Sequence, residues 1–184
     1  FFSAPLKSCP FKERSIFNED ITRWEVGNVE NMFAMFDGAI GFNQSIGDWN
    51  TSATRNMEAM FFGASAFNAN IQNWNTSNTT NMHDMFKLAT LFNCPIGGWD
   101  TSAVTKMSHL FNGADSFDQN ISSWNTAAVT DMRYMFDQAS SFNQDIGNWD
   151  TANVARMERM FNLANDFNQD LSDWNVSSAT NMTN

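Results

Sequence analysis

Large apolar residues recur every 25 residues along almost the whole chain, whereas many polar residues between them change from one repeat to the next. All seven tryptophans belong to this pattern, and each follows a Phe and an Ile or Leu at constant distances. A fixed period in the range of about 20–50 residues indicates a solenoid or a related repeat architecture. The tryptophans are Trp24, Trp49, Trp74, Trp99, Trp124, Trp149 and Trp174, and the repeats open with Phe17, Phe42, Phe67, Phe92, Phe117, Phe142 and Phe167.

One repeat cannot fold by itself. Its few apolar side chains must offset the conformational entropy of 25 ordered residues, which requires packing against a neighbour. Stacking of successive repeats therefore builds one continuous core. The pattern predicts a degenerate half-repeat that caps the N-terminal end, six full repeats and a truncated seventh. The half-repeat covers 1–16, and the repeats cover 17–41, 42–66, 67–91, 92–116, 117–141, 142–166 and 167–184.

Each repeat is expected to contain one short helix and one short strand. Val29, Met32, Met35, Phe36 and Ala39 follow the spacing of one helix face, and several repeats carry a Thr at the expected N-cap. The segment "DIGNWDT" at 145–151 is typical of a short strand between turns. The predicted fold class is an α/β solenoid, a leucine-rich-repeat-like right-handed coil with one short parallel strand and one short helix per repeat.

Composition and net charge limit the classes of function that the chain can have. The net charge of -10 and the pI near 4.4 argue against binding to nucleic acid or to an anionic membrane surface. No apolar run approaches the roughly 18–20 residues of a spanning helix, so membrane insertion is not expected. Cys9 and Cys94 form no zinc-binding pattern and are expected to be unpaired or disulfide-bonded to another molecule. The chain begins at Phe1 and stops inside the last predicted helix, which favours a processed product or a fragment of a longer array.

The repeat pattern "MFxxAxxFNxDIxxWxTSxVxxM" resembles the repeats of about 25–26 residues in BspA-like bacterial surface proteins and lipoproteins, a leucine-rich-repeat-like family. The resemblance covers residues 17–184, with departures at Leu110, Asp118 and the "NCPIGG" segment around Cys94. It implies an extracellular, elongated, non-catalytic protein used for surface display, adhesion or partner binding. The family supplies no catalytic residues to transfer to this chain.

Three polar or sulfur-containing columns (sets of residues 25 apart) could carry chemistry. The Met column has core spacing and is expected to pack, although a soft-metal site is the other interpretation. Thr51, Thr76, Thr101, Thr126 and Thr151 could form an ice-binding ladder, but each shares a strand face with the inward Trp, which favours burial. The Asn column is expected to bridge adjacent backbones: Asn18, Asn43, Asn68, Asn93, Asp118, Asn143 and Asn168.

Glycosylation is the modification that the sequence suggests. Asn50, Asn75 and Asn175 lie in Asn-x-Ser motifs between the inward Trp and the next inward position, so they are expected to face outward and accept N-linked glycans. Asn43 has the same motif but belongs to the bridging Asn column and is expected to be blocked. His83 and His109 belong to no nucleophile motif, and the acidic residues form no paired-carboxylate pattern. An enzyme, a cofactor and a metal are therefore not expected.

The leading hypothesis is a non-catalytic structural or adhesive module of an extracellular or cell-surface assembly. Its partners would be protein, through self-association or a larger filament that uses the ends and faces of the solenoid. The alternative is a ligand-binding module that recognises a glycan or a protein, with ice as an outlying ligand.

Overall fold

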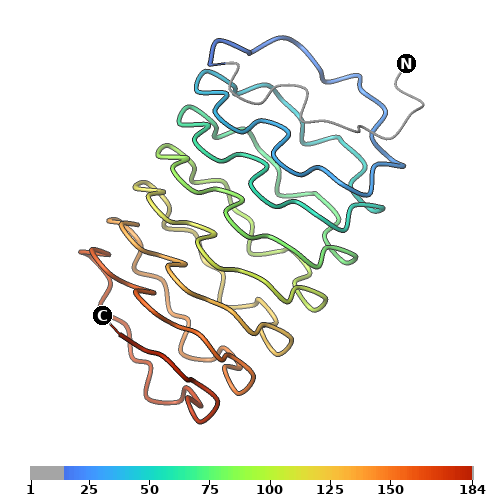
Figure 1. Cartoon of the computed structure of the whole chain (residues 1–184). Coiled ribbons are helices and arrows are strands. Elements are labelled where there is room, and N and C mark those ends of the chain that lie inside the picture. The colour runs from blue at the N-terminus through green and yellow to red at the C-terminus, as the bar shows by residue number, and fades with distance from the viewer. Residues whose placement is uncertain (1–14, 184) are drawn as a thin grey trace.

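The computed structural model describes residues 15–183, which form successive coils of 25 residues stacked in sequence order (Figure 1). Parallel β-bridges join equivalent residues of neighbouring coils: Asn31, Asn56, Asn81, Lys106, Asp131, Arg156 and Asn181. The repeat fold and its 25-residue register are therefore confirmed. The predicted cap at 1–16 lies almost wholly outside the described residues.

The predicted helix and strand are not seen. Residues 15–183 contain turns, bends and isolated bridges, with no α-helix and no extended strand. Two columns interrupt the expected helix with left-handed backbone: Ala34 and its equivalents have φ between 51° and 56°, and Gly38 and its equivalents between 58° and 71°. The bridges also fall at the start of the expected helix instead of in the Trp segment. The helical spacing correctly identified which side chains face inward. It did not identify the backbone, because a chain of β-turns directs the same side chains inward.

The backbone of residues 30–38 and their equivalents, here called the backbone-bonded side, holds neighbouring coils together. In the first coil the N–H groups of residues 32, 34, 36 and 38 donate to carbonyls of the next coil at 2.7–2.9 Å. The odd-numbered N–H groups 35 and 37 close turns within the coil. The same alternation recurs in full at residues 57–63, 82–88, 107–113 and 132–138, and it satisfies the backbone there without a helix. The Thr residues expected at helix N-caps belong to the same network: Thr105 donates its N–H to the Thr80 carbonyl at 3.0 Å.

Residues 18–26 and their equivalents, the side-chain-bonded side, are joined mainly by side chains. The Asn column bridges backbones as predicted, since Asn68 Oδ1 accepts the Asn93 N–H at 2.8 Å. The Trp99 indole N–H donates to the Ile71 carbonyl at 3.2 Å. The Thr101 hydroxyl donates to the Asn125 carbonyl at 2.9 Å. Each bond recurs at the same place in neighbouring coils, with Asp118 in place of Asn in one of them.

Aromatic ladders fill the interior. Neighbouring Trp rings lie 6.3–6.5 Å apart and within 5° of parallel. Within one coil the rings of Phe61 and Phe67 stack with centroids 3.8 Å apart, and equivalent pairs lie at 3.8–4.1 Å. Met82, Met107 and Met132 are fully buried among them, as the core interpretation predicted. Burial falls in the last described coil, where Trp174 is only partly buried and Val176 is 40% exposed.

Candidate functional site

On the backbone-bonded side, two columns of side chains differ from coil to coil and form what we call the variable face. The column after Met32 reads Phe33, Glu58, His83, Ser108, Arg133, Glu158 and Thr183, and the next reads Ala34, Ala59, Asp84, His109, Tyr134 and Arg159. All residues of the second column have positive φ. This conformation costs a side-chain-bearing residue roughly 1–2 kcal/mol, and such strain concentrates at functional sites. The strained, non-repeating side chains make this face the candidate site.

A hydrogen-bonded relay crosses two coils of the variable face. His83 Nδ1 lies 2.8 Å from Ser108 Oγ, and His83 Nε2 lies 3.1 Å from Asp84 Oδ2. Lys87 Nζ is 3.4 Å from the other oxygen of Asp84. Ser, His and Asp are the residue types of a hydrolase triad, but the two imidazole nitrogens are exchanged relative to that arrangement. Sequence spacing gave no signal of the relay because Ser108 comes from the coil after that of His83 and Asp84. Ser108 is only 4% exposed, however, so a substrate carbonyl cannot reach its hydroxyl.

Two neighbouring histidines of the variable face have pKa values shifted in opposite directions. The hydrogen bond to Asp84, followed by the charge of that carboxylate, raises the pKa of His83 despite its partial burial. Burial, assisted by the charge of Lys87, lowers the pKa of His109. Burial alone would raise the pKa of Asp84, but the hydrogen bond from His83 and the nearby positive charges lower it. His109 Nδ1 is buried and has no hydrogen-bond partner among the described residues.

Planar and cationic groups continue the variable face toward the last coil. The rings of His109 and Tyr134 stack with centroids 4.5 Å apart, and the Arg159 guanidinium lies 6.0 Å from the Tyr134 ring centroid. Beside them, Arg133 makes a close pair with Asp131 at 2.8 Å. Burial would raise the pKa of Asp131, but the hydrogen bonds and charge of Arg133 outweigh it and lower that pKa.

A buried carboxylate lies further along the same side. Asp137 is 5% exposed and accepts hydrogen bonds from Asn112 Nδ2 at 3.0 Å and Asn162 Nδ2 at 2.7 Å. One donor comes from each neighbouring coil, so the carboxylate ties three coils together. This arrangement is structural because both of its oxygens are occupied.

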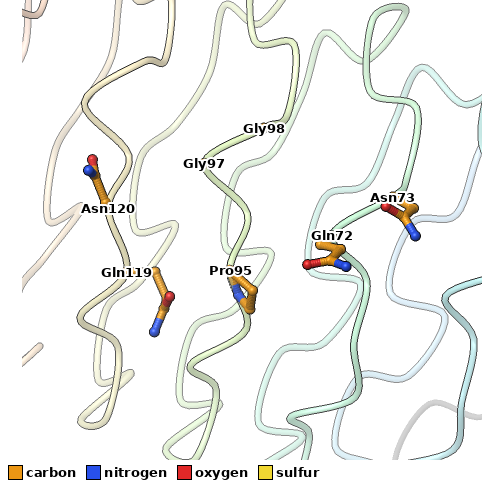
Figure 2. A pocket seen from close by; sticks show the side chains of 7 residues that line it. All are labelled: Gln72, Asn73, Pro95, Gly97, Gly98, Gln119 and Asn120. Atoms are coloured by element: carbon orange, nitrogen blue, oxygen red, sulfur yellow. The ribbon is translucent and has the colours of Figure 1, made fainter.

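A shallow depression of about 410 Å³ opens on the side-chain-bonded side (Figure 2). It arises where Pro95, Gly97 and Gly98 carry small or no side chains between the longer residues of adjacent coils. The lining is completed by Gln72, Asn73, Gln119 and Asn120. It contains no aromatic ring and no charged side chain, so it offers little to hold a ligand.

The predicted glycosylation residues share one exposed column. Asn50 Oδ1 accepts both the N–H of Ser52 at 3.1 Å and its hydroxyl at 2.7 Å. Asn75 makes the same two bonds to Ser77, and Asn175 Oδ1 accepts the Ser177 N–H. The Asn side chains are therefore outward as expected. Asn43 is also exposed, and its Oδ1 accepts the Asn68 N–H as expected for the bridging Asn column. That Asn43 is blocked as a glycosylation site stays a prediction.

The remaining predicted residues are structural where the structure describes them. Cys94 is 3% exposed, and burial raises the pKa of its thiol. Cys9 lies outside the described residues. The Thr ladder is 1% exposed and faces inward, as predicted.

Within residues 15–183, no three His, Cys, Asp or Glu side chains are placed to hold a metal ion. In the same part of the chain, no helix is long and apolar enough to cross a membrane.

These features define a repeat protein with a regular aromatic ladder in its interior and one non-repeating face. The family whose sequence profile matches is described as "Mycoplasma protein of unknown function, DUF285", and two copies match residues 7–101 and 91–184. The chain therefore belongs to the DUF285 family. No curated protein and no solved structure matches it.

Proposed function

We propose that the chain is a non-catalytic structural or adhesive module of an extracellular or cell-surface assembly. The repeated Phe, Trp and Met side chains pack in the interior, and the repeated Asn, Trp and Thr side chains take part in hydrogen bonds between coils. This structural use of the repeated residues is the observation that carries the proposal. What remains for partners is the surface of the stacked coils, and solenoids commonly bind partners through such extended surfaces. The relay around His83 supports no catalytic role because Ser108 is buried.

We also propose kinship with the BspA-like surface proteins that the repeat pattern resembles. In this view the coil is a right-handed relative of the leucine-rich repeat in which a chain of turns takes the place of the short helix and strand. The 25-residue period and the parallel bridges support this view.

Surface exposure on the source cells tests the main proposal. Antibodies raised against the folded chain should label intact cells, and mild extraction should release the protein in a particle larger than the chain itself. External protease should remove the signal without lysing the cells. Labelling that requires permeabilised cells would contradict the proposal.

The second candidate function is recognition of a glycan or a protein by the variable face. The strained positions of His109, Tyr134 and Arg159 favour it, because glycine at those positions would adopt the same φ at a lower cost in backbone energy. A glycan array and a pull-down with the purified chain should then give binding that is lost when Tyr134 and Arg159 are changed to Ala. Ice binding receives no support, since the Thr ladder faces the interior. A thermal-hysteresis measurement is expected to show no activity.

Asn50, Asn75 and Asn175 are the glycosylation sites that we propose for secretion through an N-glycosylating pathway. Their exposed side chains support this assignment, as does the Ser partner of each Asn Oδ1. Mass spectrometry of the chain secreted from eukaryotic cells should show glycans at these residues, and Ser52→Ala should remove the glycan at Asn50. An unmodified Asn50 in that system would contradict the assignment.

A further inference from the structure

Basic side chains gather on one part of this acidic molecule. Residues 15–183 carry seven Lys and Arg residues, and four of them lie in three successive coils, on the variable face or in the bridge column, which is the column joined by the β-bridges. We give the name basic patch to these four residues together with one acid and one aromatic residue between them: Lys106, Arg133, Arg156, Arg159, Asp131 and Tyr134. Since the whole chain has a net charge of -10, this local excess of positive charge indicates an anionic partner.

The basic patch is one continuous surface. The β-bridges join Lys106 to Asp131 and Asp131 to Arg156, so the three residues are neighbours along the stack. Arg133 lies 2.8 Å from the carboxylate of Asp131, and Arg156 of the next coil lies 3.7 Å from the same carboxylate. A partner that contacts one of these coils therefore contacts all three.

Three cations of the basic patch are available for a partner. Lys106 is exposed and makes no ion pair with a described residue. Arg156 is 52% exposed at its side chain, and Arg159 is exposed beside the Tyr134 ring. The acids of the same columns are already engaged, since Asp131 is held by Arg133 and Glu158 Oε1 accepts a hydrogen bond from Asn181 at 3.0 Å.

Lys106 and Arg156 also replace a hydrogen-bonding side chain that the other coils possess. In the five other described coils, an Asn or Asp in the bridge column accepts the backbone N–H two residues further along the chain. Lys106 and Arg156 have no oxygen to offer, and the N–H groups of Ser108 and Glu158 donate to no described residue. An anionic oxygen of a partner can take that position, where a cation lies beside it.

The order of charges along the bridge column selects the kind of anion. An acid, Asp131, separates Lys106 from Arg156, so the two cations are two coils apart, or about 10 Å at the usual spacing of parallel bridged chains. A polymer that is charged at every unit would place charges against Asp131 as well. A pyranose unit extends a polysaccharide by about as much as one coil extends the stack. A carboxylate on every second sugar therefore matches the two cations, and the hydroxyls of the neutral sugar between them can donate to Asp131.

We propose that the basic patch binds a linear polysaccharide that runs along the stack and carries a carboxylate on every second sugar. Its carboxylates lie at Lys106 and at Arg156, and Arg159 with the edge of Tyr134 contacts sugar hydroxyls. This inference rests on the second candidate function, glycan recognition by the variable face, and deepens it by naming the class of glycan. Exposed ion pairs are individually weak, so binding gains strength when many chains meet one polymer.

Oligosaccharides of equal length test the spacing. The probes carry glucuronate at every second sugar, uronate at every sugar, or the alternating pattern with its carboxyl groups reduced to alcohols. Calorimetry at low salt should show the tightest binding for the alternating probe and binding at least about tenfold weaker for the reduced one. The fully charged probe should bind no more tightly than the alternating one. Tighter binding of the fully charged probe or of a poly-glutamate peptide, or no binding of the alternating probe, would overturn the proposal.

Exchange of the two bridge-column cations tests the site. Lys106→Asn with Arg156→Asn installs the residue that this column uses elsewhere, so the melting temperature should not fall. Affinity for the alternating probe should drop about tenfold, because two ion pairs are lost.

The matched control removes the same charge outside the basic patch. Arg23→Asn with Arg55→Thr also installs residues that occur in those columns, and it should change the affinity by less than about twofold. Equal losses in the two double variants would show attraction by net charge alone and would overturn the proposal. Surface labelling of intact cells would still support the structural or adhesive role in that event, and binding of an uncharged glycan would still support the second candidate function, so these failures are distinguishable.

Discussion

The two long sides of each coil are bonded to the neighbouring coil by different atoms. On the backbone-bonded side, main-chain N–H groups of alternate residues donate to the next coil, as Phe86 does to Leu110 at 3.0 Å. On the side-chain-bonded side, the neighbouring coil is reached mainly by an Asn amide, a Trp indole and a Thr hydroxyl. A bond made by the backbone is available to any residue except Pro, whereas a bond made by a side chain requires that particular side chain.

This difference explains which residues repeat and which drift. Asn, Trp and Thr recur because the contacts between coils depend on their side chains. The residue types in the columns of His83 and Asp84 vary from coil to coil, because there the backbone makes the contacts between coils. The side chains of these columns are therefore free to serve another purpose. The comparison predicts that substitutions on the two sides differ in their cost to stability.

The largest contrast is expected between two aromatic residues. Trp124→Ala should lower the free energy of unfolding by about 3–5 kcal/mol, since it removes a buried ring and its hydrogen bond to the Ile96 carbonyl. Tyr134→Ala on the variable face should cost about 1 kcal/mol, because it removes a ring that is only partly buried and stacked on His109. Urea denaturation followed by fluorescence and circular dichroism gives both values. Similar losses would show that the variable face is also scaffold.

Two adjacent glycines, Gly97 and Gly98, allow a closely packed position to be compared with an open one. A Cβ at Gly97 would lie 2.3 Å from the Asn120 carbonyl oxygen of the next coil, whereas a Cβ at Gly98 would meet no atom within 4 Å. Gly97→Ala should therefore destabilise the protein by about 1–3 kcal/mol, because a backbone must shift. Gly98→Ala is the matched control in the same depression and should be neutral within about 0.5 kcal/mol in the same thermal melts. A neutral Gly97→Ala would mean that the coils are not in this close contact.

The sequence was sufficient for everything that depends on the period. The stacking of coils, the buried Met82 and Phe92, the bridging Asn68 and the inward Thr101 all follow from which positions recur. The backbone conformation did not follow, because apolar spacing reports the direction of side chains and not φ. Ala34, Asp84 and Tyr134 all occupy a left-handed position, although only glycine would have signalled it in the sequence. The relay from His83 to Ser108 was missed for a different reason, since it joins columns whose residues do not repeat.

The left-handed positions can be tested at one exposed residue. Arg159 has φ of 52°, a conformation that Asn tolerates and that β-branched residues avoid. Arg159→Val should be less stable than Arg159→Asn by roughly 1–2 kcal/mol, although both remove the same guanidinium. Chemical denaturation of the two variants measures the difference. Equal stabilities would indicate an ordinary backbone at this position and would remove the strain from the variable face.

A smaller difference in stability is expected between the loss of two Thr hydroxyls, one on each side of the coil. Thr101→Val removes the hydroxyl that donates to the Asn125 carbonyl across the coil boundary, and should cost about 1 kcal/mol. Thr105→Val should cost less, because the Thr105 backbone N–H already donates to the carbonyl that its hydroxyl contacts. Val occupies the Thr101 column in the first and last coils, at Val26 and Val176, so the fold should tolerate the change. A greater loss from Thr105→Val would reverse the assignment of the two sides.

The smallest effect concerns pH and the two histidines of the variable face. The raised pKa of His83 means that its contribution to stability is fully present below its unfolded pKa near 6.5 and is lost as pH rises through the higher folded value. The lowered pKa of His109 acts in the opposite sense, because the folded state resists protonation and loses stability as pH falls below about 6.5. The two terms partly cancel in the wild-type chain. Substituting one histidine at a time should separate them: His109→Gln should become less stable from pH 6 to 8, and His83→Gln should become more stable over the same interval. Denaturant midpoints across this range, with NMR titration of each ring, would measure both slopes, and slopes of the same sign would contradict the relay between His83 and Asp84.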